Sequence, residues 1–217
     1  MARVAVVLSG CGVFDGAEVY ESVLTLLRLD QRGAAVTVFA PDKPQMHVIN
    51  HIKGEPVEGE SRNVLVEAAR IVRGEISPLS EADAANFDAL IIPGGFGAAK
   101  NLSNFAVAGA EIEVDAELLE FAQQMRVAGK PIGLVCIAPT MSAAICGTGV
   151  RCTIGNDEET AAAVVATGAE HVECAVGDIC IDEDRKLVTT PAYMLAGSIS
   201  EAATGINALV DRIVDWV

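Results

Sequence analysis

The sequence predicts an α/β fold, a three-layer sandwich with a mostly parallel central sheet and helices on both faces. Short runs of consecutive apolar residues, typical of strands buried on both faces, alternate with segments of helical periodicity. The 217 residues are 51% hydrophobic, enough for one large core without disulfides. No repeat, low-complexity segment or linker divides the chain, so we expect a single domain over residues 1–217.

The first predicted unit is strand–helix–strand. Residues 3–8 form an apolar run that ends in the glycine-rich stretch 9–12, which predicts a buried strand followed by a turn. A helix then opens at Asp15 or Gly16, and Gly33 ends it. Its apolar face recurs at steps of three and four, through Val19, Val23, Leu26 and Leu27. Residues 35–40 form the second strand.

The remaining elements continue this alternation. Residues 41–60 are rich in proline and glycine and are expected to be loop. Helices are expected at 63–73, 115–128, 139–145, 161–166 and from 199 to 213, and strands at 87–92, 131–136, 172–174, 178–181 and 187–190. The helix at 115–128 has the clearest pattern, because its apolar residues share one face and Gly129 ends it. Strands that alternate with helices imply a parallel sheet covered on both sides.

The charge balance excludes several classes of partner. The chain has 30 acidic and 15 basic residues, a net charge of −15. Binding to nucleic acid or to an anionic membrane surface needs clustered Lys and Arg, so neither is expected. The uncharged stretch 131–150 is interrupted by prolines and glycines, which favours a strand, a turn and a short helix over a membrane span.

The six cysteines, at 11, 136, 146, 152, 174 and 180, form no C-x-x-C pair. A zinc ribbon or a thioredoxin-type motif is therefore not predicted. Cysteines scattered in apolar surroundings are typical of free thiols in an intracellular protein. The N-terminal segment is typical of a first strand rather than a signal peptide. We therefore expect a cytoplasmic protein.

Functional residues of such folds gather at the carboxyl ends of the strands, here the loops 9–16, 93–101 and 136–139. Cys136 lies where an apolar strand turns into a helix, as in a nucleophile elbow. A helix N-terminus next to it would stabilise the thiolate. The alternative is a buried structural cysteine, because the flanking glycines of G-x-S-x-G are absent.

The glycine turn at 93–97 also follows a strand. Its backbone N–H groups could face a ligand oxygen, although such turns are common without any function. No G-x-G-x-x-G is present, which disfavours nucleotide binding. Gly94, Gly12 and Asn101 come from these strand-end loops and are candidate substrate-binding residues.

Two glutamates and two histidines complete the candidates. Glu18 and Glu21 lie one helical turn apart, and a carboxylate held in the strand-end cleft would have a raised pKa. The alternative is two ordinary acidic residues at a helix start. His47 and His51 have i, i+4 spacing, but the prolines and glycines around them argue against a helical metal site. No metal and no cofactor are predicted.

Segments spread over almost the whole chain carry a family resemblance. They are Leu8–Gly16, Ala40–Lys43, Val48–His51, Arg62–Leu65, Ile92–Leu102, Cys136–Pro139 and Val188–Met194. The chain resembles the ThiJ/PfpI branch of the class I glutamine-amidotransferase-like superfamily. Within that branch it is most similar to the ElbB type, once described as isoprenoid-biosynthesis proteins with an amidotransferase-like domain. The resemblance implies a flavodoxin-like fold and a homodimer.

The resemblance also implies roles for five residues. Cys136 would be the nucleophile, and the backbone N–H groups of Gly95 and Ile137 would form the oxyanion hole. Glu21 would contact the cysteine, with Glu18 as the alternative.

The histidine that amidotransferases and peptidases of this superfamily use is missing. Amidotransferases have a histidine after a late strand, where this chain has residues 190–193, Thr-Pro-Ala-Tyr. PfpI-type peptidases have one directly after the cysteine, where this chain has Ile137. Both reactions need a base that relays a proton to a leaving amine, so both are disfavoured.

A cysteine with a glutamate and no histidine suits the cofactor-free glyoxalases among the relatives. Cys136 would add to glyoxal or methylglyoxal, Glu21 would move a proton, and glycolate or lactate would leave. Two alternatives stay open. One is a non-enzymatic redox or stress-response protein that uses Cys136 as an oxidisable thiol. The other is an amidotransferase-like accessory protein in small-molecule (isoprenoid) metabolism.

Overall fold

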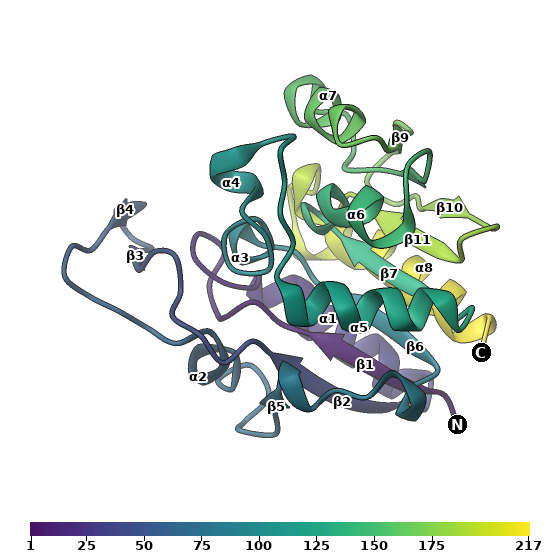
Figure 1. The fold of residues 1–217 in the computed structure, drawn as a ribbon, viewed down its shortest axis with the longest axis horizontal. Coiled ribbons are helices and arrows are strands. Elements are labelled where there is room, and N and C mark those ends of the chain that lie inside the picture. The colour runs from purple at the N-terminus through teal and green to yellow at the C-terminus, as the bar shows by residue number, and fades with distance from the viewer.

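A seven-stranded sheet forms the middle layer of the computed structural model, which describes residues 1–217 (Figure 1). The strand order is β10-β11-β7-β6-β1-β2-β5, and only β10 runs antiparallel to its neighbour. Helix α5 covers one face, and α1 and α8 pack together on the other (Figure 1). The predicted α/β fold, with a mostly parallel sheet between two helical layers, is confirmed.

The sheet contains β1 (Arg3–Val7), β2 (Ala35–Ala40), β5 (Ser77–Pro78), β6 (Ala89–Ile92), β7 (Ile132–Val135), β10 (Cys180–Asp182) and β11 (Leu187–Thr190). Two small pairs lie outside it: β3 (Ile49–Asn50) with β4 (Glu55–Pro56), and β8 (Arg151–Cys152) with β9 (Glu170–His171). The helices are α1 (Val19–Gln31), α2 (Val64–Ala68), α3 (Phe96–Lys100), α4 (Phe105–Ala108), α5 (Ala116–Val127), α6 (Ser142–Cys146), α7 (Glu158–Ala166) and α8 (Ile199–Asp215).

The continuous apolar runs of the strands arise because the sheet is buried on both faces. On β1, Ala5 and Val7 join the core under α5, whereas Val4 and Val6 join the core under α8. The same alternation divides the residues of β6 between the two cores. Successive strand side chains point to opposite faces, so two cores need apolar residues at every position.

Helix α1 begins at Val19, later than the predicted start at residue 15 or 16. The loop before it is closed by backbone bonds, in which the N–H of Gly12 donates to the Ala17 oxygen at 2.9 Å and that of Gly16 donates to the Gly12 oxygen at 2.7 Å. Glu18 then caps the helix, and its carboxylate accepts from the Glu21 N–H. This cap places two carboxylates at the carboxyl ends of the strands.

Other elements differ from the prediction in extent. The predicted helix 63–73 is helical only over α2, and the chain then turns to reach Arg73 and Gly74, whose φ values are 58° and 88°. Residues 172–174 form no strand, and the neighbouring β9 pairs with β8 instead. Helices α3 and α4 were not predicted, because four or five residues are too few to show a helical period.

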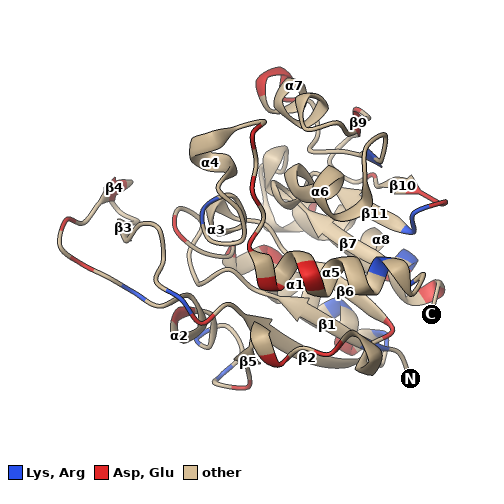
Figure 2. Cartoon of the chain, viewed as in Figure 1, with Lys and Arg blue, Asp and Glu red and all other residues tan.

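The β3–β4 pair extends away from the sheet as an arm on the side of α2 and α3 (Figure 1). Lys and Arg are scattered over several elements rather than gathered on one (Figure 2). No helix combines the length and the apolar character needed to cross a bilayer.

Three phenylalanines hold α5 against the sheet. Phe121 of α5 is 3% exposed and meets Phe87 edge to face, with ring centroids 6.1 Å apart. Phe39 of β2 meets Phe87 in the same way at 5.5 Å. We expect Phe121→Ala to lower the free energy of unfolding by about 3–5 kcal/mol in denaturant titration, because it leaves a cavity in this cluster. Val127→Ala, at a 79% exposed position of the same helix, is the control and should change it by less than about 0.5 kcal/mol; equal losses in both variants would contradict this account.

Candidate active site

Cys136 lies in a strained turn at the end of β7. Its φ is 63°, a left-handed conformation that costs a non-glycine residue free energy. Its backbone N–H donates to the Thr190 oxygen of β11 at 2.9 Å, and a short 3₁₀ helix, Ala138–Met141, follows at once. This is the geometry of a nucleophile elbow, in which the strand end, the tight turn and the helix start expose one side chain.

Glu21 lies beside Cys136 and is fully buried. One carboxylate oxygen accepts from the Gly94 N–H at 3.0 Å, and the other accepts from the Tyr193 N–H at 3.1 Å. The carboxylate lies next to the Cys136 side chain, and each group shifts the pKa of the other. Glu18, one turn earlier, is 8% exposed and holds the start of α1. Of the two glutamates, Glu21 is therefore the one in contact with the cysteine.

The backbone N–H groups of Gly95 and Ile137 lie near the Cys136 sulfur, where they favour the thiolate and lower the pKa of the thiol. Gly95 has a φ of 91°, and it precedes α3 where the chain leaves β6. Ile137 follows the cysteine in the elbow. The two donors predicted for an oxyanion hole thus converge on the sulfur from different strand ends.

Burial dominates the electrostatics of the pair. It raises the pKa of Glu21 to about 7, although N–H groups of Tyr193 and Gly94 stabilise the carboxylate. It also raises the pKa of the Cys136 thiol well above its usual value, and the adjacent Glu21 carboxylate acts in the same direction. The stabilisation of the thiolate expected from a helix N-terminus is therefore outweighed, because burial and Glu21 raise the pKa of the thiol more than the two N–H groups lower it.

A cavity of about 400 Å³ opens onto the cysteine. Of the predicted site residues, it is lined by Cys136, Glu18, Gly95 and Ile137. The residues that the sequence did not single out are Val13, Phe96, Ala99, Lys100, Phe105, Ala106, Thr160, Tyr193 and Met194. The lining residues of α3 and the pair Tyr193–Met194 follow predicted strands. The rule that functional residues gather at the carboxyl ends of strands could therefore have identified them. Phe105 and Thr160 come from α4 and α7, and no pattern in the sequence predicts that these two helices lie beside the cavity.

Glu21, Gly94, Gly12 and Asn101 do not line this cavity, and Glu21 lies behind the cysteine that does. The Asn101 side-chain amide donates to the Ser9 and Asp15 carbonyl oxygens, both at 2.9 Å, and its oxygen accepts from the Met46 N–H at 3.0 Å. Its polar groups are thus used to hold loops together. Gly12 lies in the turn before α1, where an added Cβ would meet the His51 ring at 2.6 Å. Gly12 and Asn101 thus shape the loops beside the cavity, and substrate binding by these residues and Gly94 stays a prediction.

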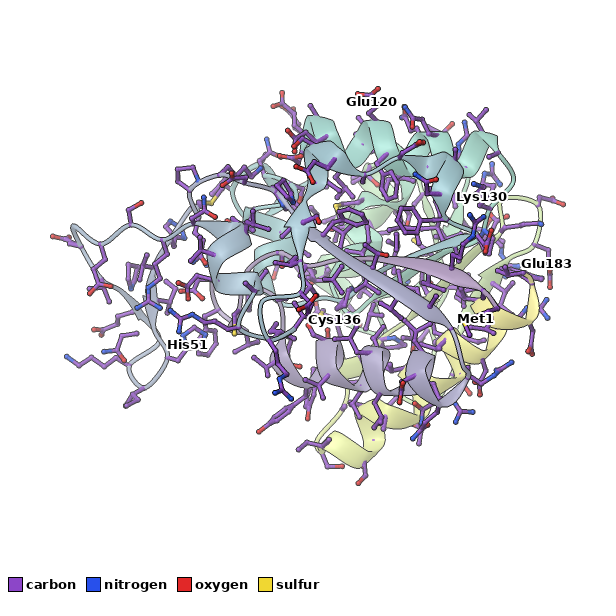
Figure 3. The ribbon with its side chains drawn as sticks, turned by 90° about the horizontal axis from the view of Figure 1, so that it is seen from below. Met1, His51, Glu120, Lys130, Cys136 and Glu183 are labelled. Atoms are coloured by element: carbon purple, nitrogen blue, oxygen red, sulfur yellow. The ribbon has the colours of Figure 1, made fainter.

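No histidine lines the cavity. Figure 3 shows His51 on the arm side of the molecule, away from Cys136. There its Nε2 accepts from the Phe14 N–H at 3.3 Å. His171 accepts from the Ile154 N–H at 3.3 Å through its Nε2. No group of three His, Cys, Asp or Glu side chains is arranged to hold a metal ion.

Gly94 is required for the close approach of β6 to the elbow. An added Cβ would lie 2.5 Å from the Cys136 Cβ and 2.8 Å from both the Glu21 Oε2 and the Val135 oxygen. We expect Gly94→Ala to lower the free energy of unfolding by about 1–3 kcal/mol, because the cysteine and glutamate must move apart. Gly197→Ala is the control, because its nearest neighbour would lie 3.4 Å away. Denaturant titration measures both, and unchanged stability of Gly94→Ala would contradict the crowding.

The fold and site define an α/β protein with a cysteine at a nucleophile elbow, next to a buried glutamate. The chain belongs to the DJ-1/PfpI family, whose model matches residues 3–194.

Three comparisons illustrate this membership. The Homo sapiens protein "glutamine amidotransferase-like class 1 domain-containing protein 3, mitochondrial" is 49% identical, over 99% of this chain and 83% of its own length. The Rattus norvegicus "ES1 protein homolog, mitochondrial" is also 49% identical, over 99% of this chain and 84% of its own. The crystal structure of an isoprenoid biosynthesis protein with an amidotransferase-like domain from Ehrlichia chaffeensis superposes with a TM-score of 0.93. It is 36% identical and covers 100% of this chain and 99% of that one.

The mitochondrial names of these curated relatives contradict the cytoplasmic location expected from the sequence. That expectation rested on free cysteines and on the lack of a secretory pattern. Free thiols indicate a reducing compartment, and they do not distinguish the cytosol from a reducing organelle.

Proposed function

We propose that the protein is a cofactor-independent glyoxalase that converts 2-oxoaldehydes to 2-hydroxy acids. The observation that carries this proposal is the buried Glu21 carboxyl group beside Cys136, at a cavity that no histidine lines. A carboxyl group with a pKa of about 7 both accepts and returns a proton near neutral pH. The reaction needs such a group, because it moves protons but expels no amine.

The first step joins the sulfur to the aldehyde. The Cys136 thiol passes its proton to the Glu21 carboxylate while the sulfur forms a bond to the aldehyde carbon. The carbonyl oxygen becomes an oxyanion, which the Gly95 and Ile137 N–H groups can hold, and it then takes up the proton. The product is a hemithioacetal, and the Glu21 carboxylate is regenerated.

The second step is an internal oxidation and reduction. Glu21 removes the hydrogen from the sulfur-bearing carbon as a proton, which gives an enediolate. The hydroxyl proton moves to the oxygen of the neighbouring carbon, and Glu21 then returns its proton to that carbon. The result is a thioester of a 2-hydroxy acid, in which one carbon has been oxidised and the other reduced. Water then cleaves the thioester and restores the thiol. No external oxidant or reductant enters the balance.

The same geometry gives less support to the alternatives. Redox-sensing cysteines are exposed and have a low pKa, whereas Cys136 is 7% exposed and its pKa is raised. The Ehrlichia chaffeensis structure supports placing the chain in the ElbB type, which would associate it with isoprenoid metabolism. An accessory role there, and a homodimer, stay predictions.

Incubation of metal-free protein with methylglyoxal, followed by enzymatic measurement of lactate, tests the proposal. We expect lactate to form without glutathione, at a rate proportional to protein concentration. Formation no faster than with the Cys136→Ala variant would overturn it.

A further inference from the structure

The cavity beside Cys136 is much larger than the smallest 2-oxoaldehydes. Its volume of about 400 Å³ falls within the range of about 300–1,000 Å³ found for pockets that enclose drug-sized ligands. Glyoxal and methylglyoxal have only two and three carbons, so either would leave most of this space to water. The dicarbonyl group would occupy the cysteine end, and the remainder of the cavity has no role in their reaction.

The remainder of the cavity is apolar. Nine of its thirteen lining residues are hydrophobic. Phe96 of α3, Phe105 of α4 and Met194 after β11 come from three separate elements to form this wall. Aromatic and thioether side chains offer broad contact surfaces to an aromatic or branched aliphatic group.

The two charged residues of the wall are already engaged within the protein. The Lys100 ammonium donates to the Phe14 carbonyl oxygen at 2.8 Å and lies over the Phe96 ring, 5.4 Å from its centroid. The Glu18 carboxylate accepts from the Glu21 N–H at 2.6 Å as the cap of α1. A charged substrate tail would have to displace these contacts, whereas an uncharged tail would leave them intact.

We propose that the natural substrates are 2-oxoaldehydes with a bulky, uncharged apolar tail, aryl or branched alkyl, held by Phe96, Phe105 and Met194. This inference rests on the proposed glyoxalase function for the reacting head group. The tail is inferred separately, from the volume and the lining of the cavity. In a fitting apolar pocket each added methylene-sized group raises kcat/KM about tenfold or more.

A substrate series tests the tail. Methylglyoxal, isobutylglyoxal and phenylglyoxal share the reacting dicarbonyl, and the 2-hydroxy acid formed from each can be measured by chromatography. We expect kcat/KM to rise at least about tenfold from methylglyoxal to phenylglyoxal. Equal or falling values would overturn the inference and leave the glyoxalase function standing. Turnover of none of the three above Cys136→Ala would overturn the function itself.

A pair of variants locates the tail. Ala106→Trp fills the cavity from an exposed position of α4, and Val107→Trp places the same side chain at a 69% exposed position outside the cavity. We expect Ala106→Trp to lower the ratio of the phenylglyoxal to the methylglyoxal kcat/KM at least fivefold, and Val107→Trp to leave it unchanged. An unchanged ratio in Ala106→Trp would place the tail elsewhere and overturn the assignment.

Alkylation provides a readout that needs no turnover. N-Methyl-, N-cyclohexyl- and N-benzylmaleimide carry the same reactive group, and mass spectrometry gives the rate at Cys136 relative to free cysteine in solution. We expect the relative rate to rise with the apolar substituent, and to lose this trend in Ala106→Trp. A relative rate that falls with substituent size would show that the cavity does not accept apolar groups, whatever the reaction catalysed.

Discussion

Cys136→Ala is expected to lower kcat/KM for 2-oxoaldehydes by about a thousandfold or more while the protein remains folded. No other cysteine lines the cavity, so no second thiol can form the hemithioacetal. Loss of a nucleophile commonly removes three or more orders of magnitude. The fold should tolerate the change, because alanine retains the Cβ of the elbow and removes one sulfur atom.

Two further variants make this result specific. Cys136→Ser retains a hydroxyl in the elbow, but an alcohol is a far weaker nucleophile than a thiol, so we expect nearly the same loss. Cys146→Ala removes a buried thiol whose pKa burial raises to about 12 and which lies outside the cavity. It should keep full activity. Initial rates with methylglyoxal, together with circular dichroism of each variant, measure both effects. Retention of more than a tenth of the activity by Cys136→Ala would rule out the covalent route.

The sequence predicts those features whose structure depends on residues that are close together in the chain. Apolar runs at 3–8 and 131–136 correspond to β1 and β7. A strand buried on both faces is apolar at every position, so its own residues are enough to identify it. The elbow at Cys136 follows from the same local order of strand, turn and helix. The pairing with Glu21 was inferred from a family resemblance, since no local rule joins residues 115 positions apart.

What the sequence missed depends on packing between distant segments. Phe105 and Thr160 reach the cavity only because α4 and α7 fold over the strand ends. Asn101 is polar and lies near a strand end, but both the nitrogen and the oxygen of its amide form hydrogen bonds with the surrounding loops. The direction of the Cys136 pKa was wrong because burial and the Glu21 charge exist only in the folded chain.

Glu21→Gln is expected to lower kcat/KM by about a hundred- to ten-thousandfold, the usual contribution of a general acid or base. Glutamine retains the size of the side chain but cannot take the proton from Cys136 or return one to the substrate. The wild-type kcat/KM should also rise with pH through about 7, because the carboxylate must be free to accept that proton. The variant should lose this rise. Glu18→Gln, which changes the cap of α1, is the comparison: it should retain the rise but shift it to lower pH, because the Glu18 charge helps to raise the pKa of Glu21.

The same substitution removes the pH dependence that Glu21 gives to the free energy of unfolding. The pKa of Glu21 is about 7 in the folded protein and 4.5 as the unperturbed value, so the folded state holds an extra proton between these limits. The free energy of unfolding contributed by this group is therefore present below pH 4.5 and is lost as pH rises through 7. At about 1.4 kcal/mol per unit, the loss between pH 5 and 8 is about 2–3 kcal/mol. We expect wild-type stability, measured by denaturant titration relative to Glu21→Gln, to fall by that amount over this range. A constant difference between the two proteins would mean that Glu21 keeps an ordinary pKa, and the acid–base role proposed for it would lose its physical basis.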